Sequence, residues 1–152
     1  MSQNPSPVRI PRAIFDELIA HAREEVPNEA CGLVGGVDDR AQTVYPARNA
    51  EASPLRYNLD PKDQFRIMSE IEERGEELAA IYHSHTASPA YPSQTDINLA
   101  LMDRREDGKV VGQEPLFPGV VYLIASLAEG EAPLRGFRID ENGVTEVELT
   151  VE

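Results

Sequence analysis

Apolar residues recur along three stretches of the chain at the spacing of an amphipathic helix. The first, residues 12–25, is followed by Pro27, which ends the pattern. The second, residues 61–74, begins after Asp60, a residue type that caps helices, and the third covers residues 93–105. The side chains predicted to pack inward are Ile14, Phe15, Leu18, Ile19 and Ala22, then Phe65, Ile67, Met68 and Ile71, then Ile97, Leu99, Ala100 and Met102.

Short apolar runs between these stretches predict strands. Residues 30–37 and 43–50 flank the turn residues Asp38-Asp39 and predict a hairpin, and residues 78–85 predict a central strand. Residues 106–118 contain two glycines and two prolines, which predicts a mobile loop. The remaining strands are expected at residues 56–59, 120–127, 134–139 and 144–149.

The order of these elements predicts an α/β fold. The chain has 152 residues, 41% of them hydrophobic, which is enough for one core. We therefore expect a single domain over residues 8–152, after a disordered tail at residues 1–7.

The charge of the chain restricts its partners. Acidic residues outnumber basic ones by 27 to 14, and the net charge of −13 repels phosphate backbones and anionic lipid. Neither nucleic acid nor a membrane is expected as a partner. The sequence shows no run of about 18 apolar residues and no secretory signal, so a cytoplasmic location is expected. The oligomeric state is left open.

Two of the three histidines form the motif His83-Ser84-His85 at the end of the predicted central strand. Residues i and i+2 of a strand point to the same face, so the two imidazoles would lie side by side as metal ligands. Asp96, at the start of the next helix, can supply a third ligand, and a catalytic zinc site needs three.

Each of these residues also has a structural interpretation. The histidines could be partly exposed strand residues, and Ser93 with Asp96 fits a helix capping box. Glu29, two residues after Pro27, is a further candidate that could be a solvated surface group. His21 is expected on the surface, and the acidic run 70–77 is expected to be solvated.

The single cysteine, Cys31, allows a different chemistry. A thiol activated by His83 or His85 would act as in cysteine peptidases, although a cysteine in an apolar strand is more often a small buried hydrophobe. One cysteine cannot form an internal disulfide, and it cannot supply the cysteine ligands of a zinc finger or a deaminase.

The stretch HSHTASPAYPSQTD, residues 83–96, resembles the motif H-x-H-x7-S-x2-D of the JAMM (MPN-plus) metalloprotease family, and PNEACGLVGG upstream resembles the strand of that family that carries the catalytic glutamate. The resemblance implies a mixed β-sheet flanked by helices, similar to that of cytidine deaminases. It further implies that His83, His85 and Asp96 bind Zn²⁺. Glu29 would be the general acid/base, and Ser93 would stabilise the oxyanion.

The resemblance also implies an activity. The chain is similar to short bacterial members of the family, which act on ubiquitin-like sulfur carriers with a Gly-Gly C-terminus and release cysteine during cysteine biosynthesis. Residues 86–92 and 106–118 would contact such a substrate. Two alternatives remain open: an isopeptidase that removes ubiquitin-like modifiers from lysine, and a non-catalytic MPN scaffold.

Overall fold

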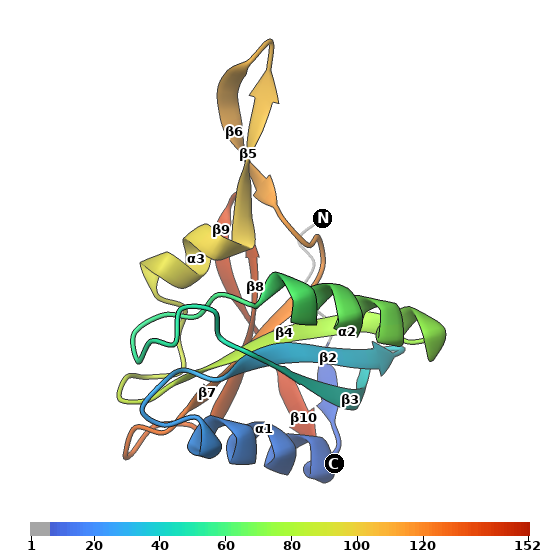
Figure 1. Cartoon of the computed structure of the whole chain (residues 1–152), viewed down its shortest axis with the longest axis vertical. Helices are drawn as coiled ribbons and strands as arrows, with labels where there is room; N and C mark the ends of the chain where they lie inside the picture. The colour runs from blue at the N-terminus through green and yellow to red at the C-terminus, as the bar shows by residue number, and fades with distance from the viewer. Residues whose placement is uncertain (1–6) are drawn as a thin grey trace.

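A mixed sheet of eight strands forms the centre of the molecule, in a computed structural model that describes residues 7–152 (Figure 1). Its strands are β1 (Val8–Ile10), β2 (Cys31–Val37), β3 (Arg40–Ala47), β4 (Glu77–His85), β7 (Val121–Ser126), β8 (Leu134–Asp140), β9 (Gly143–Val147) and β10 (Leu149–Val151). They follow the order β10-β1-β3-β2-β4-β7-β8-β9. The central strand β4 runs antiparallel to β2 and parallel to β7.

Helices cover both faces of this sheet. Helix α1 (Arg12–Glu24) lies on one face, and α2 (Pro61–Glu73) and α3 (Gln94–Ala100) lie on the other (Figure 1). Alternation along β4 divides its side chains between the two layers, because successive residues of a strand point to opposite faces. Tyr82 packs in the α1 layer, whereas Ile81 packs in the layer that contains α3.

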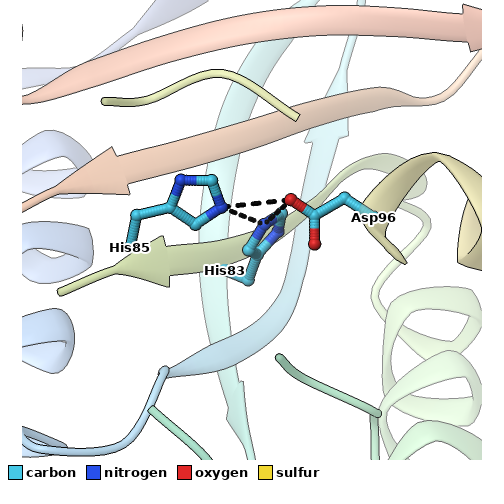
Figure 2. A group of neighbouring side chains, drawn as sticks. All are labelled: His83, His85 and Asp96. Atoms are coloured by element: carbon cyan, nitrogen blue, oxygen red, sulfur yellow. Dashed lines mark hydrogen bonds and ion pairs between the residues drawn. The ribbon is translucent and has the colours of Figure 1, made fainter. Parts of the chain in front are cut away.

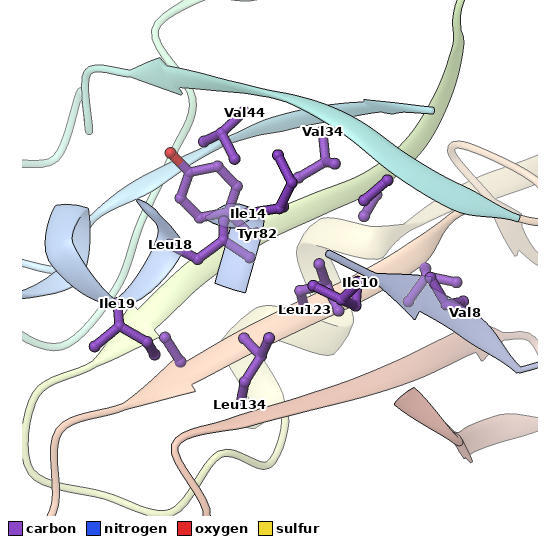
Figure 3. Packing of buried hydrophobic residues seen from close by; sticks show 14 of the residues in the cluster. Val8, Ile10, Ile14, Leu18, Ile19, Val34, Val44, Tyr82, Leu123 and Leu134 are labelled. Atoms are coloured by element: carbon purple, nitrogen blue, oxygen red, sulfur yellow. The ribbon is translucent and has the colours of Figure 1, made fainter. Parts of the chain in front are cut away.

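The larger core lies between α1 and the sheet (Figure 3). Leu18 of α1 and Leu123 of β7 are fully buried there, beside the ring of Tyr82. Gly32 of β2 allows that ring to come close, since a Cβ at this position would lie 2.6 Å from the Tyr82 ring. This tight packing holds β2 and β4 together at the end of the sheet where the histidines lie.

The smaller core on the other face fixes α2. Ile67 and Ile71 of this helix are buried against Leu33 and Tyr45 of the sheet. The Asp60 side chain caps the helix by accepting hydrogen bonds from the backbone N–H groups of Lys62 and Asp63, as the sequence predicts. The helix at residues 12–25, the hairpin around Asp38-Asp39 and the strand at 78–85 are likewise confirmed to within a few residues.

The predicted helix over residues 93–105 is wrong in its second half. Helix α3 ends at Ala100, and the chain continues as β5 (Leu101–Glu106), which pairs with β6 (Lys109–Pro115) in a separate two-stranded sheet. Most of the loop predicted at 106–118 is therefore a hairpin, which projects from the body of the molecule (Figure 1). Its turn is Asp107-Gly108, with φ values of 50° and 77°, and this dipeptide favours tight hairpin turns.

Several smaller predictions are also wrong. Residues 56–59 form no strand, only an isolated bridge between Leu59 and Asn49. Phe65 is 77% exposed instead of packed inward, and Met102 and Leu99 are also exposed. His21 is buried on α1, where its Nδ1 is hydrogen-bonded to the Tyr82 hydroxyl at 2.7 Å.

Most of the predicted tail, residues 1–6, lies outside the described part of the chain. Among residues 7–152, no helix has both the length and the apolar character needed to cross a membrane.

Candidate metal centre

The end of β4 presents two imidazoles on one face of the sheet. His83 and His85 both point to the layer of α2 and α3, and their Nε2 atoms lie 3.3 Å apart (Figure 2). Both side chains are buried, with exposed fractions of 1% and 4%. The interpretation of these histidines as partly exposed strand residues is therefore wrong.

Asp96 joins them from the first turn of α3. Its Oδ2 lies 3.0 Å from His83 Nε2 and 3.1 Å from His85 Nε2 (Figure 2). The same oxygen accepts a hydrogen bond from the Ser93 backbone N–H, while the Ser93 hydroxyl accepts one from the Asp96 N–H. This is a complete capping box, so the helix cap and the metal-ligand arrangement coexist in one pair of residues.

The three ligand atoms fit a metal ion. They form a triangle with sides of 3.0 to 3.3 Å. Ligands at about 2.0–2.1 Å from a tetrahedral ion are separated by about 3.3–3.4 Å. Two nitrogens and one carboxylate oxygen make three donors, the number found in catalytic zinc centres. They leave a fourth tetrahedral position free.

The ionisation states of these groups also suit a metal. Burial opposes the charge on Asp96, but hydrogen bonds from His83 and His85 outweigh it and hold the pKa of this carboxyl well below its usual range. Burial lowers the pKa of His83, so this ring is neutral near pH 7. Metal ligands must be ionised carboxylates and imidazoles with a free nitrogen lone pair. Asp96 meets this condition already, and an ion would displace the Nε2 protons that hydrogen-bond to it.

His85 is oriented by a contact behind its ligating nitrogen. Its Nδ1–H donates to the carbonyl oxygen of Pro89 at 2.7 Å, which leaves the lone pair of Nε2 directed at the centre. Burial acts to lower the pKa of His85, yet the hydrogen bonds with Asp96 and Pro89 raise it overall. A proton therefore competes with a metal ion for this nitrogen under mildly acidic conditions.

Glu29 lies beside the centre, just before β2. Pairing of β2 with β4 places it there, since Cys31 is opposite His83 and the Ala30 N–H donates to the Ser84 hydroxyl at 2.8 Å. Glu29 is only 4% exposed, so it is not a solvated surface group. Burial raises its pKa to about 7, the attraction of His85 lowers it and the charge of Asp96 adds to the rise.

An open pocket of about 240 Å³ connects these groups to solvent. Glu29, His85 and Ser93 line it, together with Pro54, Leu55, Thr86, Ala87 and Ser88. Of the residues expected to contact a substrate, the segment 86–92 contributes to this pocket and the segment 106–118 does not. A carboxylate with a pKa near neutrality in such a pocket is suited to moving protons.

Cys31 does not share this environment. It is fully buried, and burial raises the pKa of its thiol to about 12. A nucleophilic cysteine needs the opposite shift. The interpretation as a small buried hydrophobe is confirmed.

Three further residues near this centre are absent from the residues predicted from the sequence. They are Ser84, whose hydroxyl holds Ala30, Tyr57, whose ring stacks on His83, and Asn49, which hydrogen-bonds the Glu29 carbonyl. Ser84 could have been selected from its place between the histidines. The other two depend on the course of a loop that has no periodic pattern.

The fold and this centre together define a metal-dependent hydrolase. Residues 11–140 match the family model described as prokaryotic homologs of the JAB domain, and the chain belongs to this family. The chain is 36% identical over 141 residues to the CysO-cysteine peptidase of Mycobacterium tuberculosis, with 91% of this chain and 86% of that protein covered. It is 37% identical over 119 residues to a desampylase of Haloferax volcanii, covering 73% of this chain and 74% of that protein.

Solved structures agree with this assignment. A solution structure of a Desulfitobacterium hafniense protein superimposes with a TM-score of 0.78 at 34% identity, and covers 95% of this chain and 92% of its own. A JAB1/MPN domain protein of Archaeoglobus fulgidus, at 19% identity and a TM-score of 0.57, shares the fold over 95% of this chain and 98% of its own. The expected JAMM/MPN fold is confirmed, and the chain is a peptidase of the JAMM class.

Proposed function

We propose that this protein is a zinc peptidase that cleaves the amide bond after the C-terminal Gly-Gly of a ubiquitin-like sulfur-carrier protein and releases cysteine. The observation that carries this proposal is the convergence of His83, His85 and Asp96, at 3.0 to 3.3 Å, beside the buried carboxyl group of Glu29. Three ligands with a free fourth position and an adjacent proton carrier are the parts that amide hydrolysis requires.

Zinc is the metal that suits these ligands. A centre of two imidazoles and one carboxylate in a tetrahedral arrangement is a common catalytic zinc site. A bound zinc ion supplies Lewis acidity, which makes water a nucleophile near neutral pH and polarises the substrate carbonyl. His83, His85 and Asp96 would hold it, and the Pro89 carbonyl keeps His85 in the required tautomer.

Glu29 is proposed as the general base and acid. Its carboxylate accepts a proton from the attacking water, the bond between water oxygen and carbonyl carbon forms, and the same proton passes to the leaving nitrogen as the C–N bond breaks. Burial supports this role, because it raises the pKa of Glu29 to about 7, where both protonation states are accessible. Its Oε1 has no hydrogen-bond partner among residues 7–152 and is free for this transfer.

Ser93 is proposed to stabilise the negative charge that develops on the carbonyl oxygen. Its hydroxyl oxygen already accepts from the Asp96 N–H, so the hydroxyl proton is available to donate elsewhere. The exposed Ser93 side chain lines the same pocket as Glu29 and His85. A well-placed donor of this kind is typically worth about 3–4 kcal/mol of the activation barrier.

The choice of substrate is supported by the similarity to the mycobacterial CysO-cysteine peptidase, which extends over 91% of this chain. The pocket wall also contains small or apolar residues, among them Pro54, Ala87 and Ser88, which suits a narrow, extended peptide such as Gly-Gly. The direct test is mass spectrometry of a purified carrier–cysteine adduct incubated with the zinc-loaded protein. A fall in carrier mass by one cysteine residue, with no such fall for the inactive control Glu29→Gln, supports the proposal. An adduct that stays intact with the wild-type protein contradicts it.

A second candidate substrate is an isopeptide bond to lysine. It is supported by the 37% identity to the Haloferax desampylase and by Leu55 and Pro54, which offer apolar contact to an aliphatic side chain. Parallel assays with cysteine and lysine adducts of one carrier separate the two. A non-catalytic scaffold would cleave neither adduct.

A further inference from the structure

One loop contacts both the proposed base and a proposed metal ligand. It comprises residues 49–59, between β3 and α2, and we call it the 49–59 loop. The Glu29 N–H donates to the Ser53 carbonyl at 2.8 Å, and the Glu29 carbonyl accepts from the Asn49 side chain at 3.1 Å. Both polar groups of the Glu29 backbone, the N–H and the carbonyl, are therefore hydrogen-bonded to this loop.

The side chain of Asn49 organises the loop. Its Nδ2 donates to the carbonyls of Glu29 and Arg56, and its Oδ1 accepts from the N–H groups of Glu51 and Asn58, at distances of 3.0 to 3.1 Å. All four hydrogen-bonding positions of the amide are used. A surface loop with no strand pairing beyond the bridge of Asn49 and Leu59 depends on such contacts for a fixed shape.

The shape of the loop determines where Tyr57 lies. This residue is 5% exposed, and its ring stacks on that of His83 with centroids 4.2 Å apart and an interplanar angle of 17°. A ligating histidine is usually oriented by a hydrogen bond from its second ring nitrogen. Within residues 7–152, Nδ1 of His83 is buried and has no such partner. The stacked ring of Tyr57 is the contact that takes its place.

We propose that Asn49 is a positioning residue of the metal centre: its amide fixes the 49–59 loop so that Tyr57 holds the ring of His83 in the orientation that binds the ion. The inference rests on the proposed function only in that these residues bind a metal. Asn49 and Tyr57 do not contact the ion or the reacting atoms in this proposal. They act through His83, and Asn49 also acts through the backbone of Glu29.

The test measures zinc affinity in full-length variants by competition with a chromogenic chelator, without any substrate. Asn49→Ala and Tyr57→Leu should each weaken zinc binding by about 10-fold or more, the range seen when a contact behind a ligand is lost. Tyr57→Phe keeps the stacking and should bind as the wild type. Asn58→Ala removes an exposed amide from the same loop and is the matched control.

The double variant Asn49→Ala/Tyr57→Leu tests the route of the effect. Both changes act on His83 through one contact, so the zinc affinity of the double variant should equal that of Tyr57→Leu alone. If the two changes acted independently, their fold-losses of zinc affinity would multiply. The absorption spectrum of the Co²⁺-substituted protein should change in Asn49→Ala and Tyr57→Leu and not in the two controls. If Asn49→Ala does not fold, Asn49→Asp replaces it, because it retains the acceptor oxygen and loses both donor bonds.

The outcomes are separable. Wild-type zinc affinity in Asn49→Ala, or losses that multiply in the double variant, would overturn the inference while leaving the proposed function intact. A wild-type protein that binds no zinc would overturn both. At saturating zinc, Asn49→Ala should still show a lower kcat at unchanged KM, since the Glu29 carbonyl has lost its donor, and Tyr57→Leu should regain most of its kcat.

Discussion

Ser93 and Asp96 hold one another through two reciprocal hydrogen bonds, from Ser93 N–H to Asp96 Oδ2 at 2.9 Å and from Asp96 N–H to Ser93 Oγ at 3.1 Å. The bonds satisfy free N–H groups at the start of α3 and at the same time direct the Asp96 carboxylate at His83 and His85. The stability of a helix terminus and the geometry of the metal centre are thereby joined in one contact.

Replacing Ser93 by alanine should therefore have two effects. We expect a loss of stability of about 1 kcal/mol from the cap, and a fall in kcat of about 10²–10³-fold from loss of the proposed oxyanion donor. Thermal unfolding and initial rates measure the two effects, and Ser93→Thr should largely restore both.

The cap of α2 provides the matched control for Ser93→Ala. The Asp60 side chain accepts from two N–H groups at the start of that helix. Asp60→Ala should lower the unfolding temperature by a similar amount and leave kcat unchanged. Equal losses of kcat in the two variants would mean that Ser93 acts only through stability.

Glu29→Gln should inactivate the protein and stabilise its metal-free form. The pKa of Glu29 is about 7 in the folded state and 4.5 as its reference value. Between pH 4.5 and pH 7 the Glu29 carboxyl group ionises in the unfolded chain while it stays protonated in the folded protein. The free energy of unfolding of the wild type therefore falls as the pH rises from about 4.5 to about 7, and it does not fall further above that window. Glutamine does not ionise and avoids this loss, which we place at about 1–2 kcal/mol after allowance for solvent at the open pocket.

Chemical denaturation of both metal-free proteins at pH 4 and pH 8 tests this expectation. The Glu29→Gln variant should have a larger free energy of unfolding than the wild type at pH 8 and an equal one at pH 4. A difference that is the same at both pH values would show that burial does not raise the pKa of Glu29 in the folded state.

Zinc affinity should fall as the pH is lowered through the raised pKa of His85. The protonated ring is stabilised by Asp96 and the Pro89 carbonyl, and it must lose its proton before Nε2 can bind an ion. Calorimetric titrations in buffers of different ionisation enthalpy report the protons released. Release should be greater at pH 6 than at pH 8, and no pH dependence would show that His85 is not a ligand.

Cys31→Ala should retain activity. The thiol is fully buried and its pKa is raised to about 12, so it cannot supply a thiolate near neutral pH. A chelator should abolish turnover in the wild type and in the variant, and added zinc should restore it in both. Activity that survives the chelator and disappears in Cys31→Ala would identify a thiol mechanism instead.

The parts of the fold that the sequence predicts well are those with local or strictly periodic causes. His83 and His85 share a face because strands alternate, and Asp60 caps α2 because its side chain reaches N–H groups two and three residues ahead. The proposed roles of Glu29 and Ser93 came from the resemblance to a family, since a lone glutamate or a capping serine carries no such information by itself.

Most of the errors have tertiary causes, and one has a local cause. His21 is buried because the Tyr82 hydroxyl, 61 positions later in the chain, satisfies its ring nitrogen. The apolar spacing after Ala100 favours a helix, but the Asp107-Gly108 dipeptide favours a hairpin turn, and the hairpin of β5 and β6 is what forms. Asn49 and Tyr57 could not be selected because their proposed roles depend on the shape of the 49–59 loop, in which the Asn49 side chain hydrogen-bonds backbone groups that no periodic pattern brings together.

The hairpin of β5 and β6 stands apart from the chemistry. Among the described residues, β5 and β6 pair with each other and with no strand of the central sheet. Strand β5 continues from the C-terminal end of α3, whereas Asp96 lies in the first turn of that helix. Lengthening, shortening or replacing this arm should therefore leave the ligand triangle undisturbed. It is a position at which evolution, or a protein engineer, can graft new recognition onto the peptidase without rebuilding the catalytic apparatus.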